Sequence, residues 1–311
     1  MISLRVLDTD FDAICEAQYD IAIFASGYEA RCIHTAGLIN PSKVTNPFIF
    51  GFTEEPHAGN RHENDVFYWK RWHREPIPLS GDDEKPIYEH LHGIMQALDR
   101  PLHIILDYSS MSRLWYTAVL NWARFAAGRR EVIIDFVYAM GSYEEETPPM
   151  VIRGMVPLPG CEGRAYRLRE SVAVFGLGFY GSATLCVLDR LEADTVYAFL
   201  ASPGSSEEYA AKTREINKDL IGNPKTKDVL ELPIASIEAC YRQLAETIAP
   251  HRPDGEITLV PMGPKPHVLA SILVAMRFPE VACLRVSGAP AVDVKPAGDI
   301  VATRVIVRGE S

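Results

Sequence analysis

The sequence predicts an α/β protein built from two Rossmann-like units that an internal duplication relates by approximate two-fold symmetry. Short apolar segments typical of strands alternate with segments typical of helices, a pattern that implies mainly parallel sheets covered on both faces. In each half, an apolar segment runs into a small-residue turn, at Gly27 and at Gly178, and then into a helix. Residues 144–166 between the halves are rich in Pro, Gly and acidic residues, the composition of a connector. We therefore expect units at 1–143 and 167–311.

Two further pairs of segments repeat in the same order. Arg61 and Asn64 are echoed by Arg214 and Asn217, and the apolar segment that begins at His103 is echoed by a segment in the second half. The spacing of about 150 residues is one ordinary domain length. These matches predict a pseudo-dimer within one chain, and we expect its function where the two units meet.

The elements of the first unit follow from apolar runs bounded by helix-stopping residues. Pro41, Pro101 and Gly128 each mark the end of a helical segment. We expect strands at 2–7, 20–25, 47–52, 103–106 and 131–138, and helices at 11–17, 29–38, 64–74, 85–98 and 114–127.

The second unit is expected to follow the same order of elements. We expect strands at 171–175, 195–201, 257–260 and 281–286, and helices at 182–191, 207–220, 234–248 and 268–276. The tail at 299–307 alternates apolar and polar residues, which indicates one more edge strand.

The composition excludes several classes of protein. Of the 311 residues, 47% are hydrophobic and 23% are charged, as in an ordered globular protein. No apolar run approaches the roughly 20 residues of a membrane span, and the N-terminus does not resemble an export signal. The net charge of −10 argues against an extended nucleic-acid surface, and the six scattered cysteines argue against a disulfide framework. We expect a cytoplasmic protein with no membrane partner.

Histidines gather between His57 and His103, but in no arrangement typical of a metal site. No HxH on a predicted strand and no HExxH on a predicted helix occurs there. We expect no metal and no cofactor.

The segment from Gly176 to Gly181 matches the GxGxxG pattern between a predicted strand and helix. Such glycines let a dinucleotide phosphate approach backbone N–H groups. The next strand, however, ends in Ala201 and Ser202, without the acidic residue that holds a ribose in dinucleotide-binding folds. The alternative is a tight turn that only packs the helix on the strand.

The densest polar cluster at a strand-to-helix junction begins at Asp107. Ser109, Ser110 and Arg113 offer hydroxyls and a guanidinium to a phosphate or carboxylate, and the alternative is an ordinary helix cap. In the second unit, Gly263, Lys265 and His267 occupy the corresponding turn. A phosphoribosyltransferase is disfavoured because Asp107 has no adjacent second acid.

The repeated Arg-x-x-Asn pairs place both side chains on one helix face. Facing a groove, Asn64 and Asn217 could read base edges while Arg61 and Arg214 hold phosphates. Structural pairing of each arginine with a neighbouring carboxylate explains the repeat equally well.

Acid or base chemistry has three candidates, Glu54, Glu55 and Asp107. They would serve a nucleotide hydrolase or phosphodiesterase, the enzymatic alternative to a binding protein. No nucleophile with a matched base can be identified from the sequence.

A strand ending in Asp107, followed by Ser109, Ser110 and Arg113 and an apolar helix, resembles the ligand motif of CRISPR-associated Rossmann fold (CARF) sensor domains. Ser26 and Gly27 resemble the first-strand loop of that family, and two fused copies resemble the SAVED architecture. The resemblance implies binding of an oligonucleotide second messenger in prokaryotic antiviral defence, with a separate protein partner supplying the output activity. Ser110 and Met111 depart from the usual Gly and hydroxyl residue.

The resulting expectation is a nucleotide sensor whose ligand lies in a groove between the strand carboxyl ends of the two units. Arg113 and Lys265 would neutralise phosphates, and a subunit that has lost its ligand is the remaining alternative. The full set of expected ligand-binding residues is Ser26, Gly27, Arg61, Asn64, Asp107, Ser109, Ser110, Arg113, Gly178, Arg214, Asn217, Gly263, Lys265 and His267.

Overall fold

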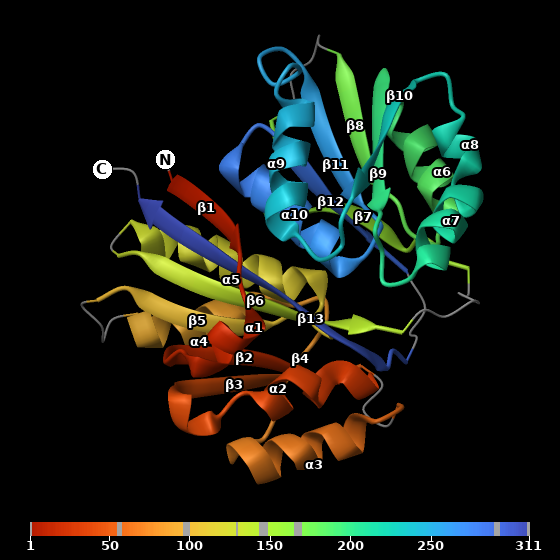
Figure 1. The fold of residues 1–311 in the computed structure, drawn as a ribbon. Coiled ribbons are helices and arrows are strands. Elements are labelled where there is room, and N and C mark those ends of the chain that lie inside the picture. Colours follow the sequence, from red (N-terminus) through yellow and green to blue (C-terminus); the bar gives the residue numbers. More distant parts are fainter. Residues whose placement is uncertain are drawn as a thin grey trace. The chain divides into compact units, whose positions relative to one another are not determined.

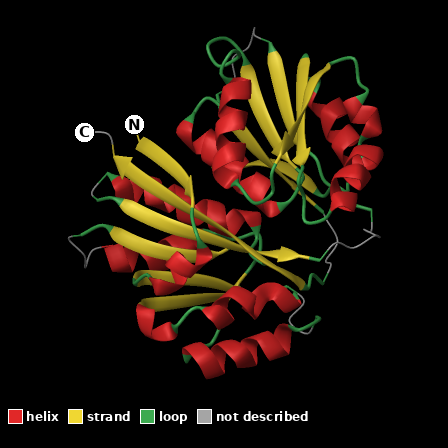
Figure 2. Ribbon diagram, in the orientation of Figure 1, coloured by secondary structure: helices red, strands yellow, loops and turns green. Residues whose placement is uncertain are grey.

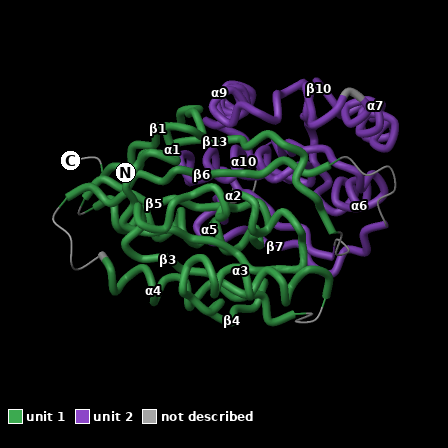
Figure 3. Tube along the Cα trace, turned by 60° about the horizontal axis from the view of Figure 1, so that its bottom comes forward, with its two compact units in different colours: residues 1–142, 292–311 green, residues 143–291 purple. Residues whose placement is uncertain are grey.

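The computed structural model describes residues 2–54, 58–95, 100–128, 130–142, 149–164, 170–288 and 293–309. The chain divides into two compact units (Figure 3). Unit 1 comprises residues 1–142 and 292–311, and unit 2 comprises residues 143–291.

Unit 1 contains a seven-stranded sheet with the order β1-β13-β6-β5-β2-β3-β4 (Figures 1 and 2). Its parallel strands are β2 (Tyr19–Ser26), β3 (Val44–Phe52), β4 (Ile77–Leu79), β5 (Leu102–Asp107) and β6 (Val132–Gly141). Counted along the chain, these five strands have the Rossmann-like order 3-2-1-4-5. The strands β13 (Pro296–Gly309) and β1 (Ile2–Asp8) extend the sheet in antiparallel fashion beyond β6.

Helices cover both faces of the unit 1 sheet. Ala22 and Phe24 of β2 pack against α1 (Phe11–Glu16), η1 (Ala30–Ile33), α2 (His34–Leu38) and α3 (Arg61–Trp72). On the opposite face, Phe50 of β3 contacts Trp115 of α5 (Arg113–Ala127) and His90 of α4 (Lys85–Met95). The division follows from the alternation of side chains along a strand. A short 3₁₀ helix, η2 (Pro41–Lys43), precedes β3.

Unit 2 has the same order of parallel strands. Its sheet runs β10-β9-β8-β11-β12-β7, with β7 antiparallel. The strands are β7 (Gly154–Glu162), β8 (Ser171–Gly176), β9 (Thr195–Ala201), β10 (Thr226–Leu232), β11 (Glu256–Pro261) and β12 (Ala282–Ser287). Numbered along the chain, β8 to β12 again read 3-2-1-4-5. This order is common to many Rossmann-like folds, so the duplication itself stays a prediction.

The helices of unit 2 also form two layers. α6 (Gly181–Leu191), α7 (Glu207–Ile216) and α8 (Lys218–Ile221) contribute to a core that includes Phe175 of β8 and Val196 of β9. The pair α9 (Ile237–Ile248) and α10 (Lys265–Arg277) packs together, and α10 lies against β11 and β12. The predicted α/β class, with two Rossmann-like units, is therefore confirmed.

The course of the chain at the ends of the units differs from expectation. The expected edge strand at 299–307 is part of β13, but it lies in the sheet of unit 1 rather than that of unit 2. The expected connector at 144–166 contains β7, which forms the edge of the unit 2 sheet. Two parallel strands, the three-residue β4 and the seven-residue β10, were also missed.

The placement of β13 has a physical basis in its buried side chains. Val301, Val305 and Val307 of this strand are buried, and β13 pairs with β6 on one side and β1 on the other. Arg304 of β13 makes a bidentate ion pair with Asp135 of β6, with Nε–Oδ1 2.7 Å and Nη2–Oδ2 2.8 Å. Alternation along 299–307 predicts a strand but carries no information on which sheet edge it joins.

Within the described residues, no helix is both long and apolar enough to cross a membrane.

Candidate functional site

The strand order of unit 1 places a topological switch point between β2 and β5. The chain leaves β2 toward the face covered by α2 and leaves β5 toward the face covered by α5. Open α/β sheets bind ligands at such points, outside the carboxyl ends of the strands. The polar residues there come from the loops after β2 and β5 and from β6. We call Glu29, Arg31, Asp107, Ser109, Ser110 and Tyr138 the switch cluster.

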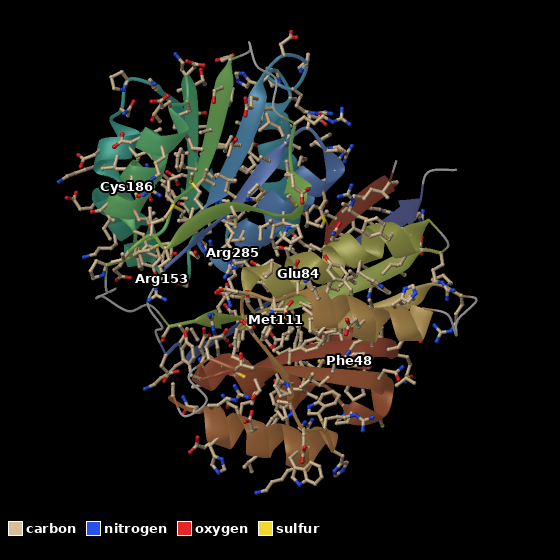
Figure 4. The ribbon with its side chains drawn as sticks, turned by 180° about the vertical axis from the view of Figure 1, so that it is seen from behind. Phe48, Glu84, Met111, Arg153, Cys186 and Arg285 are labelled. Atoms are coloured by element: carbon tan, nitrogen blue, oxygen red, sulfur yellow. The ribbon has the colours of Figure 1, made fainter. Side chains whose placement is uncertain are left out.

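Asp107 and Ser109 form the innermost part of the switch cluster. The Ser109 amide and hydroxyl both donate to Asp107 Oδ1, at 2.9 and 2.5 Å, and Ser109 Oγ accepts from the Ala139 amide at 2.8 Å. Burial raises the pKa of Asp107, against the opposing effect of the hydrogen bonds from Ser109. These two predicted ligand residues therefore tie the end of β5 to β6, and the neighbouring Met111 is buried in the same turn (Figure 4).

Glu29, Arg31 and Ser110 form the outer part of the switch cluster. Ser110 Oγ donates to Glu29 Oε2 at 3.1 Å, and Arg31 Nε donates to the same oxygen at 2.6 Å. Arg31 Nη1 donates to the Tyr138 hydroxyl at 3.0 Å. Burial lowers the pKa of Arg31, but Tyr138 and Glu29 outweigh this effect and raise it, so the guanidinium is cationic.

Sequence reasoning missed Glu29, Arg31 and Tyr138. The available signal was Arg31, a charged residue four positions after Gly27 in the segment that follows the first parallel strand. Nothing in the sequence indicates that Tyr138, on the last parallel strand, contacts this arginine.

Arg61 and Ser26 share one acceptor, the carboxylate of Asp65. Ser26 Oγ donates to Asp65 Oδ1 at 2.5 Å, and Arg61 Nε donates to the same oxygen at 2.9 Å. Arg61 Nη1 also donates to the Phe52 carbonyl at the end of β3, at 2.5 Å. Arg61 is only 9% exposed, so the alternative of structural pairing with a neighbouring carboxylate describes its contacts.

The two repeated asparagines make the same contact in the two units. Asn64 Nδ2 donates to the Gly27 carbonyl at 2.9 Å, and Asn217 Nδ2 donates to the Gly178 carbonyl at 2.8 Å. Both residues are nearly inaccessible, with exposed fractions of 1% and 2%. Each amide fixes the loop after the first parallel strand of its unit. Base reading by these residues stays a prediction.

The arginines of the repeat differ between the units. Arg214 forms an ion pair with Glu231 of β10, and the Ser202 hydroxyl donates to the same carboxylate at 2.5 Å. The Arg214 side chain is 40% exposed, so this pair lies at the surface of unit 2.

The GxGxxG glycines of unit 2 are explained by contacts within the unit. A Cβ on Gly176 would lie 2.7 Å from the Phe199 ring, and one on Gly178 would lie 2.6 Å from the Met262 carbonyl oxygen. A Cβ on Gly181 would clash with the Ile216 carbonyl oxygen, and one on Gly263 would lie 2.7 Å from the Leu177 carbonyl oxygen. The loops after β8 and β11 thus meet backbone to backbone, as the packing alternative for this motif describes.

The basic residues after β5 and β11 have different environments. Arg113 and Lys265 are the first residues of α5 and α10, and both are half-buried. Lys265 and Arg113 therefore hold the same position in the helix that follows the fourth parallel strand of each unit. His267 is fully buried against the Phe199 ring, and burial lowers its pKa to about 4, against the opposing effect of the Pro233 and Leu232 carbonyls.

The loop after β2 also contains a buried thiol. The Gly27 amide donates to Cys32 Sγ at 3.3 Å, and that thiol donates to the Ala25 carbonyl at 2.8 Å. Burial raises the pKa of Cys32 to about 12, so the thiol is protonated at neutral pH. Cys32 therefore supports the loop and is not a nucleophile.

Of the candidate acids and bases, Glu54 has a structural partner. Its Oε1 accepts from the Ser80 hydroxyl at 2.5 Å and from the Gly81 amide at 3.2 Å. Partial burial raises the pKa of Glu54, but these hydrogen bonds outweigh that effect and lower it. Glu54 is thus a carboxylate that ties the loop after β3 to the loop after β4. Glu55 and His57 lie outside the described residues.

Within the part of the chain that the structure describes, no group of three or more His, Cys, Asp or Glu side chains could hold a metal ion. All six cysteines are free thiols, and Cys186 on α6 is exposed (Figure 4).

Comparisons with known proteins do not assign the chain to a family: no family model matches it, and no curated protein matches it.

Proposed function

We propose that this protein binds a nucleotide-type ligand of the oligonucleotide second-messenger class, and that the carboxyl ends of the unit 1 strands supply the primary contacts. The observation that carries the proposal is the switch cluster. In it, hydroxyl, carboxylate and guanidinium groups from the end of β5, from the segments after β2 and β5 and from β6 converge at the switch point of a 3-2-1-4-5 sheet. Ligands of open α/β sheets bind at this place.

Unit 1 is favoured over unit 2 because of what the corresponding loops contain. In unit 2, the loops after β8 and β11 are in backbone contact through Gly178 and Gly263, and His267 is buried and neutral at pH 7. In unit 1, the same two loops meet through polar side chains, Ser110 and Glu29. Rotating side chains to admit a ligand costs less free energy than separating two backbone segments that are in contact.

The roles proposed within unit 1 follow from the position and chemistry of each side chain. Arg31 and Arg61 hold the loops through their ion pairs with Glu29 and Asp65. We assign phosphate neutralisation to Arg113 because it is half-buried at the start of α5, in the turn that follows Ser110. We assign hydrogen bonding with ribose hydroxyls or base amino groups to Glu29 and Ser110. A carboxylate is the usual acceptor for a ribose diol.

Binding without cleavage is favoured over a hydrolase. Asp107 is held by Ser109 and buried, and Glu54 is held by Ser80 and Gly81. Asp107 lacks the accessible position that a general acid or base needs beside a scissile bond, and the Glu54 carboxylate, although exposed, is occupied by its hydrogen bonds to the loop after β4. If the ligand stays intact, the CARF and SAVED resemblance leads us to propose that a separate protein supplies the output activity.

The test is a thermal-shift panel of mono-, di-, cyclic and linear oligonucleotides. A ligand at 100 times its dissociation constant adds about 2.7 kcal/mol to the free energy of unfolding, which a melting curve resolves. Arg113→Ala is expected to abolish the shift. Arg124→Ala, which removes the same charge from the other end of α5, is the control and should keep the shift.

Each result has a defined reading. No shift with any nucleotide contradicts the proposal and favours a subunit without a ligand. A shift that survives in Arg113→Ala contradicts our assignment of the phosphate position. Chromatography of the ligand after incubation distinguishes binding from hydrolysis, because a hydrolase would convert it.

A further inference from the structure

The chain re-enters unit 1 across the carboxyl ends of its strands. Residues Asp293–Lys295, which we call the strap, lead into β13 and contact three of the loops that surround the switch point. The Arg31 amide donates to the Val294 carbonyl at 3.2 Å, and the Ser142 amide donates to the Lys295 carbonyl at 2.9 Å. The strap therefore joins the loop after β2 to the end of β6.

Close packing accompanies these hydrogen bonds. A Cβ on Gly141, the last residue of β6, would clash with Val294 Cγ1 and would lie 3.3 Å from Arg31 Nη1. The strap thus lies directly over the arginine of the switch cluster. A ligand at the switch point would compete with it for space.

The strap also places a carboxylate beside the loops at the carboxyl ends of the unit 1 strands. Asp293 Oδ1 accepts from the Ala30 amide at 2.9 Å, and Asn60 Nδ2 lies 3.4 Å from Asp293 Oδ2. Asn60 comes from the loop after β3, so Asp293 connects two loops. Asp293 itself is exposed, and no cation is recorded as its partner among the described residues. An anionic ligand group could take over these two donors.

We propose that the strap is an autoinhibitory closure, shut in this structure, that a ligand must displace in order to bind at the switch point. The proposal rests on the nucleotide-binding function proposed above.

The expected change in affinity follows from the populations of the open and closed forms of the strap. For a ligand that binds only the open form, the apparent dissociation constant equals the intrinsic constant divided by the open fraction of the protein. Removing the Asp293 carboxylate weakens closure by about one hydrogen bond, which corresponds to roughly fivefold tighter apparent binding. The variant should therefore gain affinity, whereas loss of an ordinary ligand contact would reduce it.

The experiment compares Asp293→Ala with Asp299→Ala, which removes an exposed carboxylate from β13 itself. Amide hydrogen exchange without nucleotide is measured at Ala30, Arg31 and Ser142. Wild-type protein and Asp299→Ala should protect these amides. In Asp293→Ala, protection should be lost at Ala30, whose acceptor is removed, and should fall about fivefold at Arg31 and Ser142. Titration with the panel nucleotides should then show the fivefold gain for Asp293→Ala alone.

The two proposals can fail separately. Fast exchange of the three amides in the wild-type protein, or equal affinity of wild type and Asp293→Ala for a nucleotide that binds, overturns the strap proposal and leaves the proposed function intact. If Asp293→Ala binds a nucleotide that the wild type does not, the strap proposal is supported. If neither protein binds any nucleotide, the proposed function and the autoinhibitory role fail together. Protection of the three amides in the wild-type protein would then show that the strap has a structural role alone.

Discussion

Acid should destabilise unit 2 through His267, which the fold holds neutral. Burial lowers the pKa of this imidazole from 6.5 to about 4, against the opposing effect of the carbonyls of Pro233 and Leu232. Above pH 6.5 neither the folded nor the unfolded state binds the proton, so His267 has no effect on stability there. Below pH 6.5 the unfolded state binds the proton first. Stability therefore falls as the pH falls, until the folded state also binds the proton near pH 4.

The expected magnitude is large relative to the stability of a domain. With these two pKa values, the loss is about 2 kcal/mol at pH 5 and about 3 kcal/mol at pH 4 and below. Other groups also titrate in this range, so the informative quantity is the difference between two proteins. His267→Gln removes the titration and keeps a polar side chain whose charge does not change with pH.

The assay is urea denaturation at pH 7, 6 and 5, with hydrogen exchange of β9 and β11 peptides to assign the transition to unit 2. The difference in free energy of unfolding between wild type and His267→Gln should shift by about 2 kcal/mol between pH 7 and 5, in favour of the variant. His62→Gln, which changes an exposed histidine of α3, is the control and should follow the wild type. Equal slopes for wild type and His267→Gln would refute the reasoning, because they would show that His267 binds its proton equally in both states.

Three further predictions concern stability. Asp135→Ala removes the buried carboxylate that accepts from Arg304 and from the Tyr19 hydroxyl, and urea denaturation should show a free energy of unfolding lower by about 3 kcal/mol. Asp299→Ala, which removes an exposed carboxylate of β13, is the control and should leave the stability unchanged. Gly178→Ala should lower the free energy of unfolding by about 2 kcal/mol, because its Cβ would lie 2.6 Å from the Met262 carbonyl oxygen. The control is Gly93→Ala in α4, where no atom lies within 4 Å of the added Cβ, and this variant should stabilise the protein. Equal effects of the two substitutions would contradict the packing explanation. Asn64→Ala and Asn217→Ala should each cost about 1 to 2 kcal/mol, measured as separate losses in units 1 and 2, and a neutral result for either would show that its loop is held by other contacts.

The sequence was informative about the site where the signal was local. Asp107 ends β5, Ser109 and Ser110 follow it closely, and the structure brings the three residues together in the switch cluster. The repeat of Asn64 as Asn217 corresponds to one contact made twice, which a loop-holding role requires in both units. Glu29, Arg31 and Tyr138 were missed because the contacts that bring them into the cluster join distant parts of the chain: Glu29 and Ser110 are 81 residues apart, and Arg31 and Tyr138 are 107 residues apart.

The sequence by itself determined the α/β class and the positions of most strands and helices, because alternation, apolar runs and Pro or Gly stops act within a few residues. It also placed the polar loops at the ends of β2 and β5. Only the tertiary structure decided that β13 returns to unit 1, that the unit 2 glycines pack against backbone, and that Asp293 lies beside Ala30. These outcomes depend on which buried surfaces and hydrogen-bond partners meet across the chain, and local sequence patterns carry no record of such pairings.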